Sequence, residues 1–208
     1  MVPSQSTVTM NIQSNKMNTI ASSTTASSTN ATNNNTNTSS PSHPIKCEWM
    51  LWAHLPQDSD WSLNSYKRVS RFTSVEETVA ITETLPEPLV KNCMLFVMRD
   101  GIAPMWEDPR NRDGGNFSYK ISNKIVAETW RDLSYMLVGE SLSSNNEIAN
   151  SVTGISISPK KNFCIIKIWF NNCKNQNPAL ITSEIPGITS QGVLFNKHDK
   201  HADFKIHL

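Results

Sequence analysis

The alternation of apolar and polar side chains predicts a series of short strands from residue 46 onward. In the segment 46–55, every second residue falls on one side of an extended chain (Cys47, Trp49, Leu51, Ala53), and the residues between them face the other side (Met50, Trp52, His54). Seven further runs are rich in β-branched and aromatic residues: 66–72, 93–99, 116–121, 152–158, 163–170, 192–196 and 204–207. The pattern therefore predicts about eight strands.

Apolar residues at helical spacing predict helices between these strands. Ser74 and Glu77 have the spacing of a capping box, so a first helix begins after Ser74 and ends before Pro86. A second helix is predicted over 122–138, with Gly139 at its end. Its apolar stripe consists of Ile125, Val126, Thr129, Trp130, Leu133 and Leu137.

A third, weaker helix is predicted over 177–185, because Pro186-Gly187 ends it early. Many short strands in succession with helices between them indicate an α+β fold. We expect an antiparallel sheet that helices cover on one face.

Composition divides the chain near residue 42. Residues 1–42 contain 27 Ser, Thr or Asn, a single charge (Lys16) and no aromatic side chain, so they cannot bury enough surface to offset the entropy of ordering. Residues 43–208 hold all six tryptophans. We predict a disordered tail over 1–42 and one folded domain over 43–208.

The remaining composition excludes several classes of protein. No segment approaches the roughly 20 apolar residues of a membrane span, and the N-terminus lacks the features of a secretory signal. The spacing of the four cysteines fits neither a zinc site nor a disulfide scaffold, which indicates thiols in the cytosol. The net charge of +1 excludes binding driven by a large cationic surface, but not a local phosphate site.

Enzyme chemistry has no support in the sequence. Phosphate-cradling, dinucleotide-binding, zinc-protease and nucleophile-elbow motifs are absent from it. One cluster near the C-terminus has metal-ligand residue types: His198, Asp199, His201, Asp203 and His207. Histidines this close to a terminus are usually solvated or hydrogen bonded, so we predict no metal and no cofactor.

Two tryptophans stand in polar loops, where a core tryptophan is not expected. Trp61 follows a turn-like polar segment, and Trp106 lies in the loop 101–108 between strands. Such residues either hold the ends of the sheet together or stack on a flat ligand. Glu107 follows Trp106, and a carboxylate beside a stacking ring can accept two hydrogens from a guanine edge and favour a positively charged base.

The order and spacing of several motifs resemble the translation initiation factor 4E family, which binds the mRNA 5′ cap. The most specific is Asp100-Gly101-Ile102-Ala103-Pro104-Met105-Trp106-Glu107-Asp108, followed by Gly114-Gly115. The other matching positions are His43-Pro44, Trp49 to Trp52, Trp61, Gly139-Glu140, Trp169 and His201-Ala202-Asp203. The resemblance implies a curved eight-stranded antiparallel sheet with three helices on its convex face.

The resemblance also implies roles for individual residues. Trp61 and Trp106 would sandwich the 7-methylguanine ring, and Glu107 would accept hydrogen bonds from its N1 and N2. Trp169 would touch the methyl group. The alternative for Trp169 is a buried strand aromatic.

The expected phosphate contacts depart from the family pattern. The family usually supplies three basic side chains to the cap triphosphate, and those positions here are Asn116, Lys160 and Ile165. Lys160 is therefore the main phosphate candidate. Further basic residues that could compensate are Lys161, Arg110, Arg112, Lys197 and Lys200.

The surface for protein partners departs further. In the family, a tryptophan on the first helix anchors the leucine of a YxxxxLΦ helix from the scaffold factor 4G or from 4E-binding proteins, and here that position is Val79. The other residues expected on this surface are His43, Pro44, Val75, Arg131, Asp132 and Tyr135.

The sequence thus predicts a monomeric, non-enzymatic protein that binds capped mRNA and has no contact with membranes. Its second partner would be a co-adapted 4G-like scaffold or a 4E-binding protein. The alternative is a translational repressor or interaction module on the same fold that does not recruit the usual scaffold.

Overall fold

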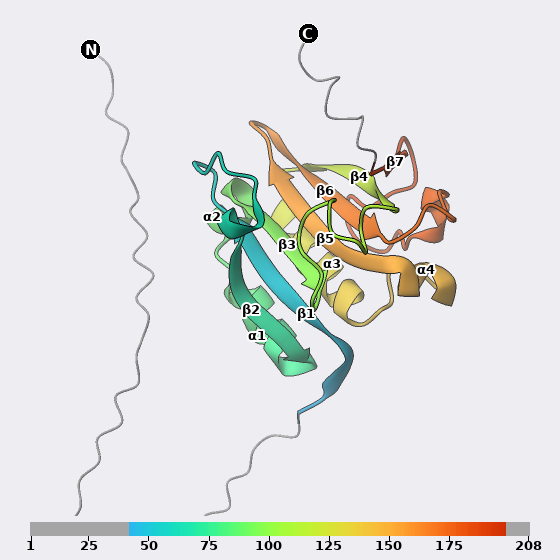
Figure 1. Cartoon of the computed structure of the whole chain (residues 1–208), viewed down its shortest axis with the longest axis horizontal. Coiled ribbons are helices and arrows are strands. Elements are labelled where there is room, and N and C mark those ends of the chain that lie inside the picture. The colour runs from blue at the N-terminus through green and yellow to red at the C-terminus, as the bar shows by residue number, and fades with distance from the viewer. Residues whose placement is uncertain (1–41, 199–208) are drawn as a thin grey trace, which may run out of the picture. The chain divides into compact units, whose positions relative to one another are not determined.

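A computed structural model describes residues 42–198 of the chain. Within these residues, seven strands form one antiparallel sheet in the order β2-β1-β3-β5-β6-β4-β7 (Figure 1). The strands are β1 (Pro44–His54), β2 (Lys67–Ser74), β3 (Met94–Arg99), β4 (Gly115–Ser122), β5 (Val152–Pro159), β6 (Phe163–Phe170) and β7 (Phe195–Lys197). Each of the seven overlaps a predicted strand, which confirms the α+β class. The predicted eighth strand, 204–207, lies outside the described residues.

The two faces of the sheet carry different clusters of apolar side chains. Trp49 and Leu51 of β1 belong to the main core, which the helices complete. Met50 and Trp52 belong to a smaller cluster on the opposite face, together with Phe96, Met98, Ile102 and Trp169. The alternation read from residues 46–55 is therefore confirmed, and it leaves the smaller cluster facing away from the helices.

Helices α1 (Val75–Thr84), α2 (Glu87–Asn92) and α3 (Val126–Val138) pack on the main-core face, as Figure 1 shows. A short α4 (Asn146–Ser151) and two 3-10 turns, Leu63–Ser65 and Pro178–Leu180, complete the described elements. The predicted apolar stripe of the second helix is confirmed, because Val126, Trp130 and Leu133 are buried in the core.

Two predictions about helices need correction, and two helices were missed. Helix α3 begins at Val126 and not at Ser122, because Ser122 still pairs with Phe163 in the sheet. The segment 177–185 contains only the 3-10 turn, because Thr182 N donates to Leu142 O (2.9 Å) and so leaves the helical ladder. Helices α2 and α4 were not predicted.

The ends of α1 and α3 show how local chemistry sets the boundaries. Ser74 Oγ accepts from Glu77 N (3.2 Å), as the capping box predicts, but the Glu77 carboxylate accepts from Thr73 N (2.9 Å) and not from Ser74 N. Helix α3 ends at Gly139, yet the left-handed residue is Glu140 (φ 52°). A Cβ on Gly139 would lie 3.2 Å from Tyr135 O, so glycine here serves close approach and not a positive φ.

The boundary between the tail 1–42 and the domain 43–208 stays a prediction, because residues 1–41 and 199–208 lie outside the described part. Within residues 42–198, no helix has both the length and the apolar character needed to cross a bilayer. All four cysteines are free thiols, as their spacing predicts.

Candidate functional site

The four aromatic and acidic residues singled out in the sequence line one pocket of about 440 Å³ on the sheet face opposite the main core. Trp61 comes from the loop after β1, Trp106 and Glu107 from the loop between β3 and β4, and Trp169 from β6. These segments are distant in sequence. The fold therefore brings together the residues that the motif-based interpretation requires.

The loop that carries Trp61 is fixed by its own polar side chains. Asp60 accepts from Ser62 N (2.8 Å) and from Ser62 Oγ (2.7 Å), and Asp60 O bonds to the ring of His54 (2.8 Å). The buried His54 ring stacks on the Trp61 indole, with centroids 4.2 Å apart and planes 4° from parallel. Trp61 is still 55% exposed. One face of the indole is thus supported by His54, and much of its surface remains accessible to a ligand.

The loop that carries Trp106 and Glu107 is held in place by hydrogen bonds to Asp108 and Asn111, which follow Glu107 in the sequence. Asp108 Oδ2 accepts from Ala103 N (2.8 Å), and the amide of fully buried Asn111 donates to Ala103 O (3.1 Å) and Met105 O (2.9 Å). Gly101 begins the loop with φ 77°, a conformation that favours glycine. The loop geometry therefore depends on Asp108 and Asn111 more than on the two residues that face the pocket.

Trp169 is both a buried strand aromatic and a residue of the pocket lining. It is 7% exposed and belongs to the small apolar cluster, yet it also lines the pocket. Its indole Nε1 donates to Ser156 Oγ (2.9 Å). The His198 ring lies 4.9 Å from it, and the His198 ring nitrogens contact Asn111 O (2.8 Å) and the Asn116 amide (3.1 Å).

Several pocket residues were not anticipated from the sequence: Tyr66, Met94, Phe96, Ser156, Ser158 and Lys167. Burial, with the nearby Glu107 carboxylate, raises the pKa of Tyr66 to about 12, so its hydroxyl stays neutral. Tyr66 also contacts His54 and Phe96 edge to face, with centroids 5.1 Å and 5.5 Å apart. All of the unanticipated residues except Tyr66, which precedes β2, lie within strands, where only alternation could have indicated them.

The described basic residues that were predicted as phosphate contacts, including Lys197, are not part of this pocket lining, and Lys200 lies outside the described residues. Lys160, Lys161 and Arg112 are exposed. Arg110 is also exposed and pairs with Asp108 (3.6 Å) in the loop. The basic residue that does line the pocket is Lys167.

The residues predicted as a partner surface gather on the helical side of the sheet. Val75, Val79 and Tyr135 line a mainly apolar hollow of about 210 Å³, with Ile45 and Val138. Tyr135 donates to Glu83 (2.8 Å), and Arg131 contacts Asp132 (3.1 Å) and Glu83 (3.9 Å). His43 pairs with exposed Glu76 (2.6 Å), and Pro44 begins β1.

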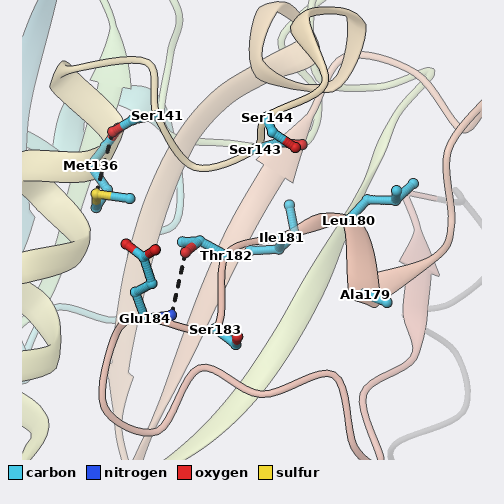
Figure 2. Close-up of a pocket in the computed structure, with 10 residues that line it drawn as sticks. All are labelled: Met136, Ser141, Ser143, Ser144, Ala179, Leu180, Ile181, Thr182, Ser183 and Glu184. Atoms are coloured by element: carbon cyan, nitrogen blue, oxygen red, sulfur yellow. Dashed lines mark hydrogen bonds between the residues drawn. The ribbon is translucent and has the colours of Figure 1, made fainter.

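A second cavity, of about 520 Å³, lies between the end of α3 and the segment 179–184 (Figure 2). Its lining is rich in hydroxyl groups, and Glu184 is its charged member. It contains no aromatic ring on which a base could stack. We therefore assign the candidate site to the tryptophan-lined pocket.

Of the five C-terminal residues with metal-ligand side chains, only His198 is described, and the other four lie outside the described part. Within residues 42–198, no three His, Cys, Asp or Glu side chains are close enough to hold a metal ion.

Comparison with known proteins agrees with this geometry. Residues 44–207 match the family model described as "Eukaryotic initiation factor 4E". The chain is 29% identical over 175 residues to "Eukaryotic translation initiation factor 4E-2" of Schizosaccharomyces pombe, covering 78% of this chain and 68% of that relative.

Solved structures show the same fold. The complex of C. elegans eIF4E-3 with the 4E-binding protein Mextli and cap analog aligns with a TM-score of 0.58 at 22% identity, over 64% of this chain and 76% of that one. Ascaris suum eIF4E-3 with m7G cap aligns with a TM-score of 0.57 at 23% identity, over 65% and 77%. The family match extends over most of the chain and includes every element that forms the pocket. The chain belongs to the eukaryotic initiation factor 4E family.

Proposed function

We propose that this protein binds the 7-methylguanosine cap of mRNA between Trp61 and Trp106 and acts in translation initiation in the cytoplasm. The observation that carries the proposal is the convergence of Trp61, Trp106 and Glu107 on one pocket. Family membership and the cap-bound relatives support cap binding. The family consists of initiation factors and not of enzymes, so the mechanism is recognition without catalysis.

Stacking would select the methylated base through its charge. N7 methylation makes guanine cationic, and a cation between two indole faces gains a cation–π contribution of about 1–2 kcal/mol in a partly desolvated site. His54 already supports one face of Trp61, so little ordering is needed when the base enters. Unmethylated guanine would also stack between the two indoles, but it would lack the cation–π contribution to the binding free energy.

Glu107 would read the guanine edge. Its carboxylate can accept from N1 and N2 of the base, and the Trp106 backbone amide can donate to O6. Glu107 is exposed and is the acidic member of the pocket lining, so a base would shield the pair of hydrogen bonds from water. The methyl group of the base would then face Trp169.

A second role is favoured by a specific observation on the helical side. Val79 stands 43% exposed beside the apolar hollow, and the Tyr135–Glu83 hydrogen bond joins α3 to α1 there. With Val79 as the anchor and the Tyr135–Glu83 hydrogen bond as a polar bridge beside it, this surface suits a partner helix whose sequence differs from that of the usual 4G helix. The protein would then bind caps as a repressor or with a co-adapted scaffold.

Tryptophan fluorescence tests the proposal directly. The protein is titrated with 7-methylguanosine triphosphate and, as the matched control ligand, with GTP. We expect strong saturable quenching by the methylated ligand and little by GTP, because Trp61 and Trp106 would report stacking. The Trp106→Ala variant should lose the preference for the methylated ligand. Equal or absent quenching in the wild type would contradict cap recognition.

A further inference from the structure

Lys167 is a basic residue in the lining of the tryptophan-lined pocket. It lies on β6 two residues before Trp169, and both side chains line the pocket, whereas Ile166 and Ile168 between and beside them belong to the main core. In the sheet, Lys167 is opposite Ser118 on β4 and Ser156 on β5. Small neighbours on both strands leave the long lysine side chain room to reach into the pocket.

Lys167 shares the pocket lining with the Glu107 carboxylate but forms no ion pair with it. Within residues 42–198, Lys167 makes no salt bridge with an acidic side chain. Burial and, after it, the charge of Lys160 lower the pKa of Lys167. Burial also lowers the pKa of His198, and the charge of Lys167 adds to that effect.

A half-buried ammonium group that forms no ion pair among the described residues disfavours the folded protein. Lys167 lies outside the main core, to which its neighbours Ile166 and Ile168 belong. An anionic ligand would balance the charge of Lys167, and the amide of Asn116 and the hydroxyl of Ser158 supply further polar groups on the same sheet face. A lysine at this position offers the positive charge and the hydrogen-bond donors that a phosphate group binds.

We propose that Lys167 is the principal phosphate ligand of the pocket and binds the phosphate next to the ribose of the cap nucleotide. The proposal rests on the proposed function, since the base must stack between Trp61 and Trp106 for its phosphate to reach β6. Successive residues on one strand face are about 7 Å apart. A nucleotide whose base lies against Trp169 therefore presents its first phosphate to Lys167, while exposed Lys160 at the β5–β6 turn can reach only the distal phosphates.

A ligand series separates the phosphate contribution from the base contribution. Wild type, Lys167→Met, Lys167→Arg, Lys160→Met and the control Lys124→Met are titrated with 7-methylguanosine, its 5′-monophosphate and its 5′-triphosphate. Lys124 is exposed in the turn before α3 and does not line the pocket. The thermal midpoint of each ligand-free variant is also measured.

We expect wild type to bind the monophosphate more tightly than the nucleoside. Lys167→Met should weaken both phosphorylated ligands by roughly 10- to 100-fold, as loss of a charge-assisted hydrogen bond predicts, and leave nucleoside affinity unchanged. Lys167→Arg should restore part of the loss. Lys160→Met should affect the triphosphate alone. The ligand-free Lys167→Met variant should unfold at the same or a higher temperature.

Two results would overturn the assignment while cap recognition stands. One is an equal loss of nucleoside and nucleotide affinity in Lys167→Met, which would make the lysine a structural part of the pocket. The other is an unchanged monophosphate affinity in that variant. A wild type that binds none of the three ligands would instead refute the proposed function, and the assignment of Lys167 with it.

Discussion

At the residue scale, the proposed reading of the guanine edge depends on Glu107. Glu107→Gln keeps the side chain's size but turns one acceptor oxygen into an amide donor, which would face a guanine donor. We expect the affinity for 7-methylguanosine triphosphate to fall by about 1–3 kcal/mol, with the thermal midpoint unchanged because Glu107 is exposed. Titration by fluorescence gives the affinity. Glu87→Gln, at an exposed residue of α2, is the matched control, and unchanged affinity in Glu107→Gln would remove Glu107 from the site.

Site residues could be predicted from the sequence where the residue type did not fit an ordinary structural role at its position. Trp61 and Trp106 stand in polar loops, which drew attention to them. Lys167 and Tyr66 gave no such signal, because each sits inside an ordinary strand pattern and becomes a pocket residue only through the pairing of β6 with β4 and β5 or the packing against His54. Their roles depend on long-range register, which the sequence does not state.

Asn111 shows how a loop is set by a residue that does not face the ligand. Asn111→Ala removes two hydrogen bonds to the backbone of the Trp106 loop. We expect roughly tenfold weaker cap-analogue binding and a loss of about 1–3 kcal/mol of unfolding free energy, because the partly buried carbonyls of Ala103 and Met105 lose their donor. Binding is measured well below the thermal midpoint.

The control for this loop is Val90→Ala, which removes buried apolar contacts on α2, away from the pocket. It should lower stability by a similar amount and leave the affinity unchanged. If both variants bind equally well, Asn111 stabilises the fold without positioning Trp106.

The junction between α3 and β1 predicts a dependence of stability on pH. Glu140 accepts from Lys46 (2.6 Å) and Arg99 (2.8 Å). Burial alone would raise the pKa of Glu140, but hydrogen bonds from Lys46, Cys47 and Arg99 and the charge of Arg99 lower it to about 2. Because this pKa is lower in the folded than in the unfolded protein, the stabilisation is full above about pH 4.5 and is lost as the pH falls toward 2.

Glu140→Gln isolates this contribution. We expect the variant to lose roughly 3 kcal/mol of unfolding free energy at pH 6, and the difference from wild type to shrink steadily between pH 4.5 and pH 2. Urea unfolding at several pH values measures the unfolding free energy of the variant and of the wild type. Subtracting one from the other cancels the contributions of the other carboxylates. A difference that stays constant with pH would show that packing, and not the ion pair, stabilises this junction.

Elements were predictable in proportion to their length and regularity. The strands and α3 have enough residues for their periodicity to appear. Helices α2 and α4 have six residues each, too few for a helical stripe. The segment 177–185 has isoleucines at helical spacing, but its backbone bonds to Leu142 and its Ile181 and Ile185 enter the core from an irregular chain.

At the scale of the whole molecule, the sheet separates two surfaces. The tryptophan-lined pocket lies on one face, and the apolar hollow of Val75, Val79 and Tyr135 lies among the helices on the other. The core between them is closely packed around Trp49, Leu51 and Trp130. Substitutions on the helical surface should therefore change partner choice without changing affinity for the cap.

Val79→Trp tests this separation and the identity of the partner together. A tryptophan on exposed Val79 would extend the apolar hollow and supply the aromatic anchor that a YxxxxLΦ helix requires, so we expect at least tenfold tighter binding of such a peptide. Calorimetric titration of wild type and variant measures it. Val69→Trp, on a β2 residue 51% exposed and outside the hollow, is the matched control and should bind no more tightly. If Val79→Trp gains nothing, the Arg131 and Tyr135 contacts to Glu83 must themselves exclude the usual helix, and the natural partner must accommodate that polar bridge.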